Sequence, residues 1–174
     1  MKSALAIRPA TQDDAIAIAD VCIRAARGAY VDLVTRDYLD RVVGYFFDVE
    51  RLRRETVPGL GWFGFAVAED AGAIVAVAGT GRSAEHTEAC ELFALYVDPA
   101  SQRRGIGRSL VEQAGDAAHE DGARRLDVAV MPGNLTAVRF YQTCGFTPAG
   151  EREIYAPHGK EGGPPVALLY SRNL

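Results

Sequence analysis

Hydrophobic and polar positions along the chain follow helical and strand periods, and their order predicts a mixed α/β domain. Apolar residues at helical spacing, with capping residues such as Thr11 and Asn134 before them, indicate five helices. These helices are expected at residues 11–28, 30–43, 49–57, 105–122 and 134–145. Short apolar or alternating runs are typical of strands. They cover residues 4–7, 62–69, 73–82, 91–97, 126–130, a segment from 146 onward, and 166–171.

This order predicts about seven strands in one mostly antiparallel sheet flanked by helices. Asp70-Ala71-Gly72 indicates a hairpin, because glycine in a short loop between two strand-like runs permits a tight turn. The sheet is expected to be antiparallel except around the helical crossover between the Glu91 strand and the Leu126 strand. No repeat or linker interrupts the chain, so residues 1–174 are predicted to form a single domain.

Composition excludes some classes of function. The 174 residues are 48% hydrophobic and 24% charged, so the chain can bury a core. Its net charge of −4 argues against the basic surface that nucleic-acid binding requires. Arg51, Arg53 and Arg54 lie without interleaved aromatic residues and predict a solvated helix face. We therefore expect no nucleic-acid partner, and a cationic acceptor fits this charge better than an anionic one.

Cysteine, histidine and hydropathy patterns favour a reduced compartment. The three cysteines and three histidines are scattered, without disulfide or metal-ligand spacing, so no bound metal is expected. The first nine residues are too short for a signal peptide, and no apolar run approaches the length of a membrane span. These features predict a cytoplasmic protein without a membrane partner. They do not reveal the oligomeric state, and a homodimer stays open.

The stretch from Glu91 to Ser109 carries the clearest chemistry. An apolar strand ends at Asp98-Pro99, and a basic, glycine-bearing loop then opens a helix near Gly105. The first turn of a helix exposes N–H groups without intrahelical partners, and its dipole adds positive charge, so an anion can bind there. Glycine lets a phosphate approach the backbone, and arginines add charge-assisted hydrogen bonds. An ordinary solvated basic loop is the alternative interpretation.

Two common phosphate motifs do not fit this junction. A Walker loop needs a lysine, which the sequence lacks between Lys2 and Lys160, and the dinucleotide fingerprint needs a small residue where Leu110 stands. The remaining pattern of strand, Gln-Arg-Arg-Gly-Ile-Gly and helix resembles the pyrophosphate loop of the GNAT superfamily of acyl-CoA-dependent N-acyltransferases. Residues 134–146 (NLTAVRFYQTCGF) are similar to a second pattern of that superfamily, Asn-x-x-Ala-x-x-Phe-Tyr-x-x-x-Gly-Phe.

The resemblance implies a GNAT-like α/β (α+β) fold whose sheet is splayed between the Glu91 and Leu126 strands. It also implies that acetyl-CoA binds to the strand, the loop and the later helix. The implied cofactor-binding residues are Leu95, Tyr96, Val97, Gln102, Arg103, Arg104, Gly105, Ile106, Gly107, Arg108, Asn134 and Tyr141. In that family the strand backbone pairs with the pantetheine arm, the asparagine contacts the cofactor, and the tyrosine lies near the thioester sulfur.

The implied chemistry is direct transfer of an acetyl group from acetyl-CoA to a primary amine. Glu91 is the candidate base, Tyr141 the candidate acid for the leaving thiolate, and a backbone N–H near residues 95–97 the candidate oxyanion donor, particularly if the strand bulges there. Each residue also has a simpler interpretation: Glu91 as a surface carboxylate, Tyr141 as a core aromatic, and Asn134 as a helix cap. Cys144 is interpreted as a small apolar residue and not as a nucleophile.

The acceptor is expected to be a small-molecule or peptide amine, although no motif identifies it. Asp32 and Asp37 would attract a cation. Tyr30, Tyr38 and Tyr45 could line its pocket or simply pack between helices. The alternative function is a non-catalytic acyl-CoA-binding sensor or interaction domain, against which the presence of the candidate acid argues.

Overall fold

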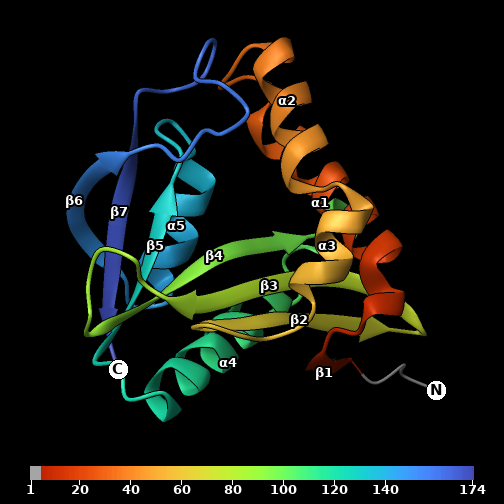
Figure 1. Ribbon diagram of the computed structural model, residues 1–174, viewed down its shortest axis with the longest axis vertical. Coiled ribbons are helices and arrows are strands. Elements are labelled where there is room, and N and C mark those ends of the chain that lie inside the picture. Colours follow the sequence, from red (N-terminus) through yellow and green to blue (C-terminus); the bar gives the residue numbers. More distant parts are fainter. Residues whose placement is uncertain (1–4) are drawn as a thin grey trace.

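The computed structural model describes residues 5–174 as five α-helices and seven strands in one sheet (Figure 1). The helices are α1 (Ala15–Tyr30), α2 (Arg36–Phe46), α3 (Val49–Glu55), α4 (Ile106–Glu120) and α5 (Leu135–Thr143). The strands are β1 (Ala6–Pro9), β2 (Trp62–Asp70), β3 (Ala73–Arg82), β4 (Ala89–Val97), β5 (Arg125–Val130), β6 (Thr147–Glu153) and β7 (Val166–Asn173).

The sheet has the strand order β1-β2-β3-β4-β5-β7-β6. All neighbouring strands are antiparallel except β4 and β5, which α4 connects as a parallel pair. That pair extends only from Ala89 opposite Arg125 to Glu91 opposite Asp127. Beyond it the two strands separate, and Figure 1 shows β5 and β7 running steeply away from β2, β3 and β4. The predicted α/β fold with a splayed sheet is therefore confirmed.

Helices cover both faces of the sheet and create two hydrophobic cores. On the face covered by α1 and α3, Ile18, Val67 and Val77 are fully buried. On the face covered by α4, Leu92 and Leu110 are almost completely buried. Successive side chains of a strand point to opposite faces, so the central strands contribute to both cores. The opening between β4 and β5 is thus framed by strands that packing holds in place.

The first strand differs from the sequence prediction. It is predicted at residues 4–7 but spans Ala6–Pro9, because that segment is the one that pairs with residues 66–69 of β2. Pro9 can end this strand because β1 is at the edge of the sheet, where a missing N–H is tolerated. Ala4 lies outside the described residues. The second helix also starts later than predicted: it is expected from residue 30, but α1 continues to Tyr30 and α2 begins at Arg36, after its cap at Thr35. The ends of the other predicted elements shift by a few residues.

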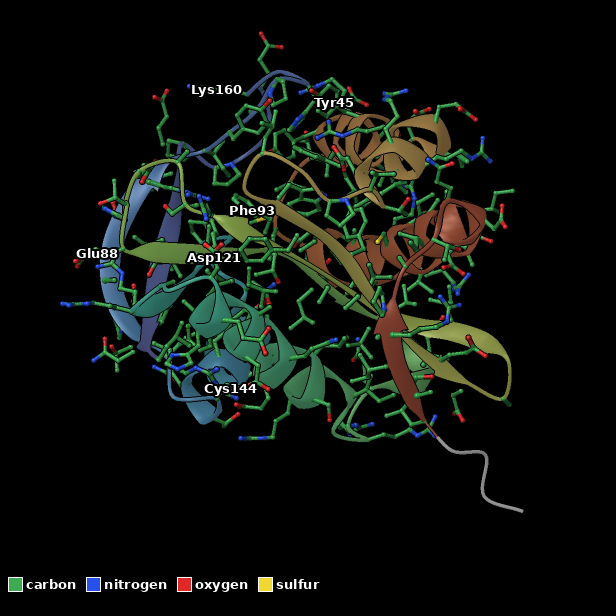
Figure 2. All side chains as sticks on the ribbon, turned by 60° about the horizontal axis from the view of Figure 1, so that its bottom comes forward. Tyr45, Glu88, Phe93, Asp121, Cys144 and Lys160 are labelled. Atoms are coloured by element: carbon green, nitrogen blue, oxygen red, sulfur yellow. The ribbon has the colours of Figure 1, made fainter. Side chains whose placement is uncertain are left out.

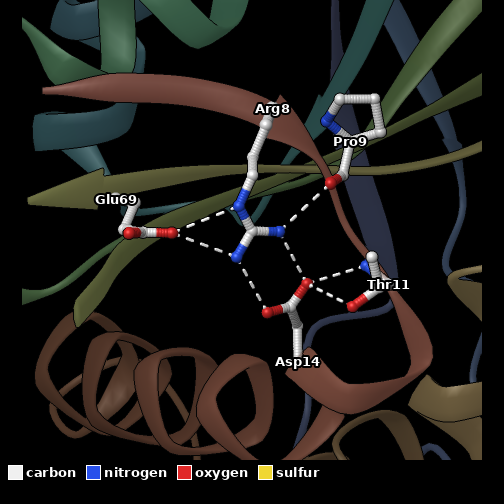
Figure 3. A network of polar contacts seen from close by, with 5 residues as sticks. All are labelled: Arg8, Pro9, Thr11, Asp14 and Glu69. Atoms are coloured by element: carbon white, nitrogen blue, oxygen red, sulfur yellow. Dashed lines mark hydrogen bonds and ion pairs between the residues drawn. The ribbon is translucent and has the colours of Figure 1, made fainter. Parts of the chain in front are cut away.

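An arginine network fastens β1 to the start of α1 and to β2 (Figure 3). Arg8 donates to Asp14 at 2.8 and 3.0 Å and to Glu69 at 3.1 Å. Asp14 also accepts the backbone N–H of Thr11 at 2.7 Å, which gives the capping-box start predicted for this helix. The hydrogen bonds from Arg8 lower the pKa of Asp14 to about 2. The carboxylate therefore stays ionised, and this corner keeps its contacts, over most of the pH range.

Candidate active site

The edge of β4 that faces β5 has no strand partner over residues 92–97, within the part of the chain that the structure describes. The opposite edge of β4 pairs with β3 as far as Val97. Leu95, Tyr96 and Val97 are half-buried, so this free edge borders the opening. Gln102 covers its end by donating from Nε2 to the Val97 carbonyl at 3.3 Å. An extended ligand can add to such an edge like another strand.

The one register shift between β3 and β4 lies at Phe93, earlier than the segment at residues 95–97 where a bulge was considered. Phe93 is unpaired between Leu92 and Ala94. Gly79 of β3 lies opposite this bulge, and a Cβ there would stand 2.7 Å from Trp62, so glycine permits the close approach of the indole. The Phe93 side chain is 49% exposed and its ring lies 6.0 Å from that of Trp62. The bulge therefore turns an aromatic side chain toward solvent on the strand that carries Glu91.

The loop between β4 and α4 presents backbone N–H groups. Arg103 and Gly105 have left-handed φ values of 61° and 82°. Left-handed residues in a turn can form a concave nest of N–H groups that binds anions. In α4, the Ser109 N–H donates to the Gly105 carbonyl at 3.1 Å, while the N–H groups of residues 106–108 precede this ladder. The loop and the helix start thus combine two backbone features that suit a phosphate.

The three arginines of this loop differ in their partners. Arg104 forms an ion pair with Asp70 at 2.8 Å, and Arg108 donates to the Thr143 carbonyl at 2.8 Å. Arg103 makes no hydrogen bond or ion pair with any residue from 5 to 174. Of the three, Arg103 is therefore the guanidinium that can bind a ligand without first giving up a protein contact.

The two glycines of the loop also have different surroundings. A Cβ built on Gly105 would meet no atom within 4 Å, whereas one on Gly107 would lie 3.2 Å from the Phe140 ring of α5. Gly107 therefore permits close packing of α4 against α5. Gly105 borders open space, which is what a group approaching the backbone requires. The sequence interpretation gave both glycines the same role, and the structure separates them.

Tyrosines from three elements gather where β4 faces α5. Burial raises the pKa of Tyr30 in α1, of Tyr96 in β4 and of Tyr141 in α5. The charge of an ionised Tyr141 would further raise the pKa of Tyr96, and that of an ionised Tyr30 would raise the pKa of both Tyr96 and Tyr141. The structure thus brings together a residue of the predicted cofactor strand and the predicted acid.

Helix α5 holds Tyr141 by packing its ring. Tyr141 is 7% exposed and makes edge-on contacts with Phe140 and Phe146, with ring centroids 5.2 and 5.4 Å away. Its hydroxyl has no hydrogen-bond partner among residues 5–174, so it can donate to a ligand. Asn134 caps the helix by accepting the Ala137 N–H at 3.1 Å, as the simpler interpretation of that residue proposed.

Glu91 is the last residue of β4 that pairs with β5, and the two strands separate beyond it. Its side chain is 3% exposed and forms a two-bond ion pair with Arg152 of β6, with Nη1 2.8 Å from Oε2 and Nη2 bonded to Oε1. Burial raises the pKa of Glu91, and Arg152 opposes this shift. Glu91 is therefore a buried, paired carboxylate and not a surface group. The pairing with Arg152 was not foreseen, because it joins residues 61 positions apart.

An aromatic cluster joins α2 to the loop between β6 and β7, and Figure 2 shows Tyr45 of α2 near the part of this loop that carries Lys160. His158 of this loop packs against Tyr38, Tyr45 and Phe46, with ring centroids 5.1, 6.2 and 5.4 Å away. Arg41 donates to the His158 carbonyl at 2.9 Å. Tyr38 is fully buried in this packing, while Tyr45 is 37% exposed. Of the tyrosines considered for the acceptor pocket, Tyr45 thus keeps a solvent-facing surface and Tyr38 has the packing role.

Acid should weaken the docking of this loop on α2. Neither ring nitrogen of His158 has a hydrogen-bond partner among the described residues, and burial, followed by the charge of Arg41, lowers the pKa of the imidazole. The contribution of neutral His158 to folding stability is then fully present above the ordinary histidine pKa of about 6.5. It is lost as the pH falls through the lowered pKa of His158 in the folded state. We expect the melting temperature of His158→Phe to fall less than that of wild type between about pH 7 and pH 5. Parallel melting curves over this range would contradict the assignment.

The sequence profile of the acetyltransferase (GNAT) family matches residues 20–146. The chain belongs to this family. The matched segment includes α2, α3, the whole of β2 to β5, the loop between β4 and α4 (residues 98–105), α4 and α5. The GNAT resemblance read from the loop and from residues 134–146 is thereby confirmed.

Curated relatives of this GNAT protein match it over part of their length. The ribosomal protein bS18-alanine N-acetyltransferase of Escherichia coli K12 is 37% identical over 82 residues, which cover 46% of this chain and 55% of that protein. Mycothiol acetyltransferase of Beutenbergia cavernae is 36% identical over 69 residues, 40% of this chain and 22% of that protein. The match thus spans about half the length of the first of these relatives.

Solved structures resemble the whole GNAT domain. The PaiA N-acetyltransferase of Thermoplasma acidophilum, in complex with coenzyme A, has a TM-score of 0.82 at 17% identity and covers 98% of this chain and 99% of its own. The putative acetyltransferase yncA of Salmonella typhimurium, with acetyl-CoA, has a TM-score of 0.65 at 21% identity and covers 99% and 95%. At these identities the likeness establishes the shared fold.

The part of the GNAT chain that the structure describes contains neither a metal-binding cluster nor a helix suited to a membrane. Among residues 5–174, no group of three or more His, Cys, Asp or Glu side chains could hold a metal ion. None of the helices in the same range has the length and apolar character to cross a membrane. Cys144, Cys90 and Cys22 are buried free thiols whose pKa burial raises, which does not suit a nucleophile.

Proposed function

We propose that this protein is an N-acetyltransferase that moves an acetyl group from acetyl-CoA to a primary amine by direct transfer. One observation carries the proposal: the free edge of β4 leads into a loop whose open backbone position, Gly105, adjoins the unpartnered N–H groups that start α4. A thioester with an extended arm and a diphosphate suits this site, because the arm could pair with the free edge of β4 and the diphosphate could bind the N–H groups that start α4. Family membership supports the same activity.

The residues present fit the cofactor. The N–H groups at residues 106–108 and the guanidinium of Arg103 would hold its diphosphate, and the backbone of Leu95 to Val97 would hold its extended arm. Asn134 and Tyr141 would border the arm from α5. When bound, acetyl-CoA supplies an activated acetyl group as a thioester.

Tyr141 is proposed as the acid. Its pKa is raised by burial, so Oη carries its proton throughout the neutral range and can give it to a leaving sulfur. Fixed packing by Phe140 and Phe146 holds the ring, so only the direction of the O–H bond remains to be set.

Glu91 is proposed as the base, acting through water. Leu95 lies four residues further along β4, roughly 13 Å at the rise of an extended strand, so an amine near Leu95 is beyond direct reach of the carboxylate. Each carboxylate oxygen has two lone pairs, so Glu91 can keep both bonds to Arg152 and still accept a water proton. Burial, which raises the pKa of Glu91, makes it a stronger base than a free carboxylate.

The acceptor is proposed to be a small-molecule or peptide amine. The matched bS18-alanine N-acetyltransferase acts on an alanine of a ribosomal protein, which favours the amino group of a polypeptide as one class to test. Asp32 and Asp37 are exposed and would attract a cation, whereas the charge of Glu91 is compensated by Arg152. A screen of CoA release over amino acids, polyamines, aminoglycosides and N-terminal peptides would identify the acceptor.

Arg103→Ala should weaken acetyl-CoA binding about 10- to 100-fold, because a hydrogen bond to a charged group contributes roughly 1.5–3 kcal/mol. Titration calorimetry would measure the acetyl-CoA dissociation constant of the variant and of wild type. Arg53→Ala is the matched control: Arg53 is paired with Glu50 on α3, away from the loop, and its removal should leave acetyl-CoA affinity unchanged. Equal affinities of wild type and Arg103→Ala would remove Arg103 from the proposed site.

A further inference from the structure

Arg152 connects the C-terminal hairpin to the strand that carries the proposed base. It lies on β6, an edge strand of the sheet, and reaches the Glu91 carboxylate with both terminal nitrogens. The Arg152 side chain is 22% exposed, and that of Glu91 is 3% exposed. A buried carboxylate held by both oxygens has one orientation, because rotation would break a charge-assisted bond in low dielectric.

The surroundings of Glu91 otherwise disfavour its charge. Asp127 stands opposite Glu91 on β5 and is itself buried. The negative charges of Asp127 and of Glu85, in the β3–β4 connection, both raise the pKa of Glu91. Asp127 has its own partners, since it accepts from Arg125 at 2.8 and 3.0 Å and from Ser171 at 2.6 Å. Arg152 is therefore the cation that compensates Glu91, while Arg125 is already bonded to Asp127.

We propose that Arg152 is a positioning residue that keeps the Glu91 carboxylate ionised and fixes its direction for proton transfer. The inference rests on the proposed function of Glu91 as base. Loss of the positive charge would leave burial, Asp127 and Glu85 acting together, and all three favour the protonated acid. A protonated Glu91 cannot take a proton, so Arg152 would set the lowest pH at which the reaction runs.

The pH dependence of turnover separates this role from a purely structural one. Arg152→Gln keeps a polar side chain and removes the charge, whereas Arg152→Lys retains the charge. An opposite charge within about 4–6 Å lowers a carboxyl pKa by roughly 1–3 units. We therefore expect the acidic limb of kcat for Arg152→Gln to move upward by about one pH unit or more, with an approximately tenfold loss of rate below that limb. The limb of Arg152→Lys should stay near that of wild type.

All variants are compared with one acceptor, so the titration of the acceptor amine is common to them. The acetyl-CoA dissociation constant should be unchanged, because Arg152 lies on β6 and not in the loop between β4 and α4. An unshifted limb in Arg152→Gln, or a loss of rate that is equal at every pH, would overturn the proposal.

A second pair of variants keeps the test valid if Arg152→Gln folds poorly. Glu91→Gln removes the buried charge, so the double variant Glu91→Gln/Arg152→Gln leaves no unpaired ion. In the Glu91→Gln background the second substitution should not lower kcat further, because Arg152 acts through Glu91. A further tenfold loss in the double variant would show that Arg152 acts independently and would overturn the proposal. Failure of wild type to acetylate any amine would instead count against the proposed function.

Discussion

Tyr141→Phe should lower kcat by about 10²- to 10⁴-fold while acetyl-CoA affinity is retained, because general acid catalysis typically contributes a factor of this size. The substitution removes one hydroxyl and keeps the ring that packs between Phe140 and Phe146. The hydroxyl has no partner within residues 5–174, so its loss leaves no protein group unsatisfied. A fall in kcat without a fall in binding would place the interaction in the transition state.

The matched control is Tyr170→Phe. Tyr170 is a buried tyrosine of β7 in the same core, 8% exposed, and β5 separates its strand from β4. Removal of the Tyr170 hydroxyl should leave kcat unchanged. If Tyr141→Phe turned over at the wild-type rate, with the chemical step shown to limit turnover, Tyr141 would have only a packing role.

Gly105→Asp should reduce acetyl-CoA affinity by up to about three orders of magnitude relative to Gly105→Asn. The two substitutions have the same shape, and Asn and Asp both tolerate the left-handed conformation that Gly105 adopts at φ 82°. They therefore carry similar backbone strain and differ in one negative charge. Near a protein surface a like charge about 4 Å away costs roughly 4 kcal/mol, which corresponds to about a thousandfold in affinity.

Calorimetry of both variants measures this difference directly, and raising the salt concentration should reduce it. The comparison avoids Gly107, where any side chain would meet Phe140 and disturb the contact between α4 and α5. Equal affinities of the Asp and Asn variants would mean that no phosphate binds at Gly105.

Much of the fold could be predicted because local patterns determine it. The helical and strand periods, the glycine loop at Asp70 to Gly72 and the crossover between the Glu91 and Leu126 strands all appear in the structure. The candidate phosphate-binding loop between β4 and α4 could be proposed for a similar reason, since its charges and glycines are consecutive in the chain. The error at β1 arose because strand pairing, and not the apolar run, sets its ends.

The parts that were missed depend on contacts between distant segments. Arg152 sits between Glu151 and Glu153 in an exposed strand, and its own sequence neighbours give no sign that it reaches Glu91. His158 lies in a polar, glycine-rich loop whose composition gives no sign of packing, yet it packs among the rings of α2. The different surroundings of Gly105 and Gly107 likewise depend on the position of α5 and cannot be read from the loop alone.

The proposed roles of Tyr141 and Glu91 both depend on transfer of an acetyl group from acetyl-CoA to an amine nitrogen. Mass spectrometry of a panel of amines, incubated with acetyl-CoA and the purified protein, tests it most directly when CoA release is measured in the same reactions. We expect at least one primary amine to gain a single N-acetyl group with one CoA released per product, and we expect a large loss of this product with Tyr141→Phe. Acetyl-CoA binding without acetylation of any amine, or acetylation of hydroxyl groups alone, would contradict it.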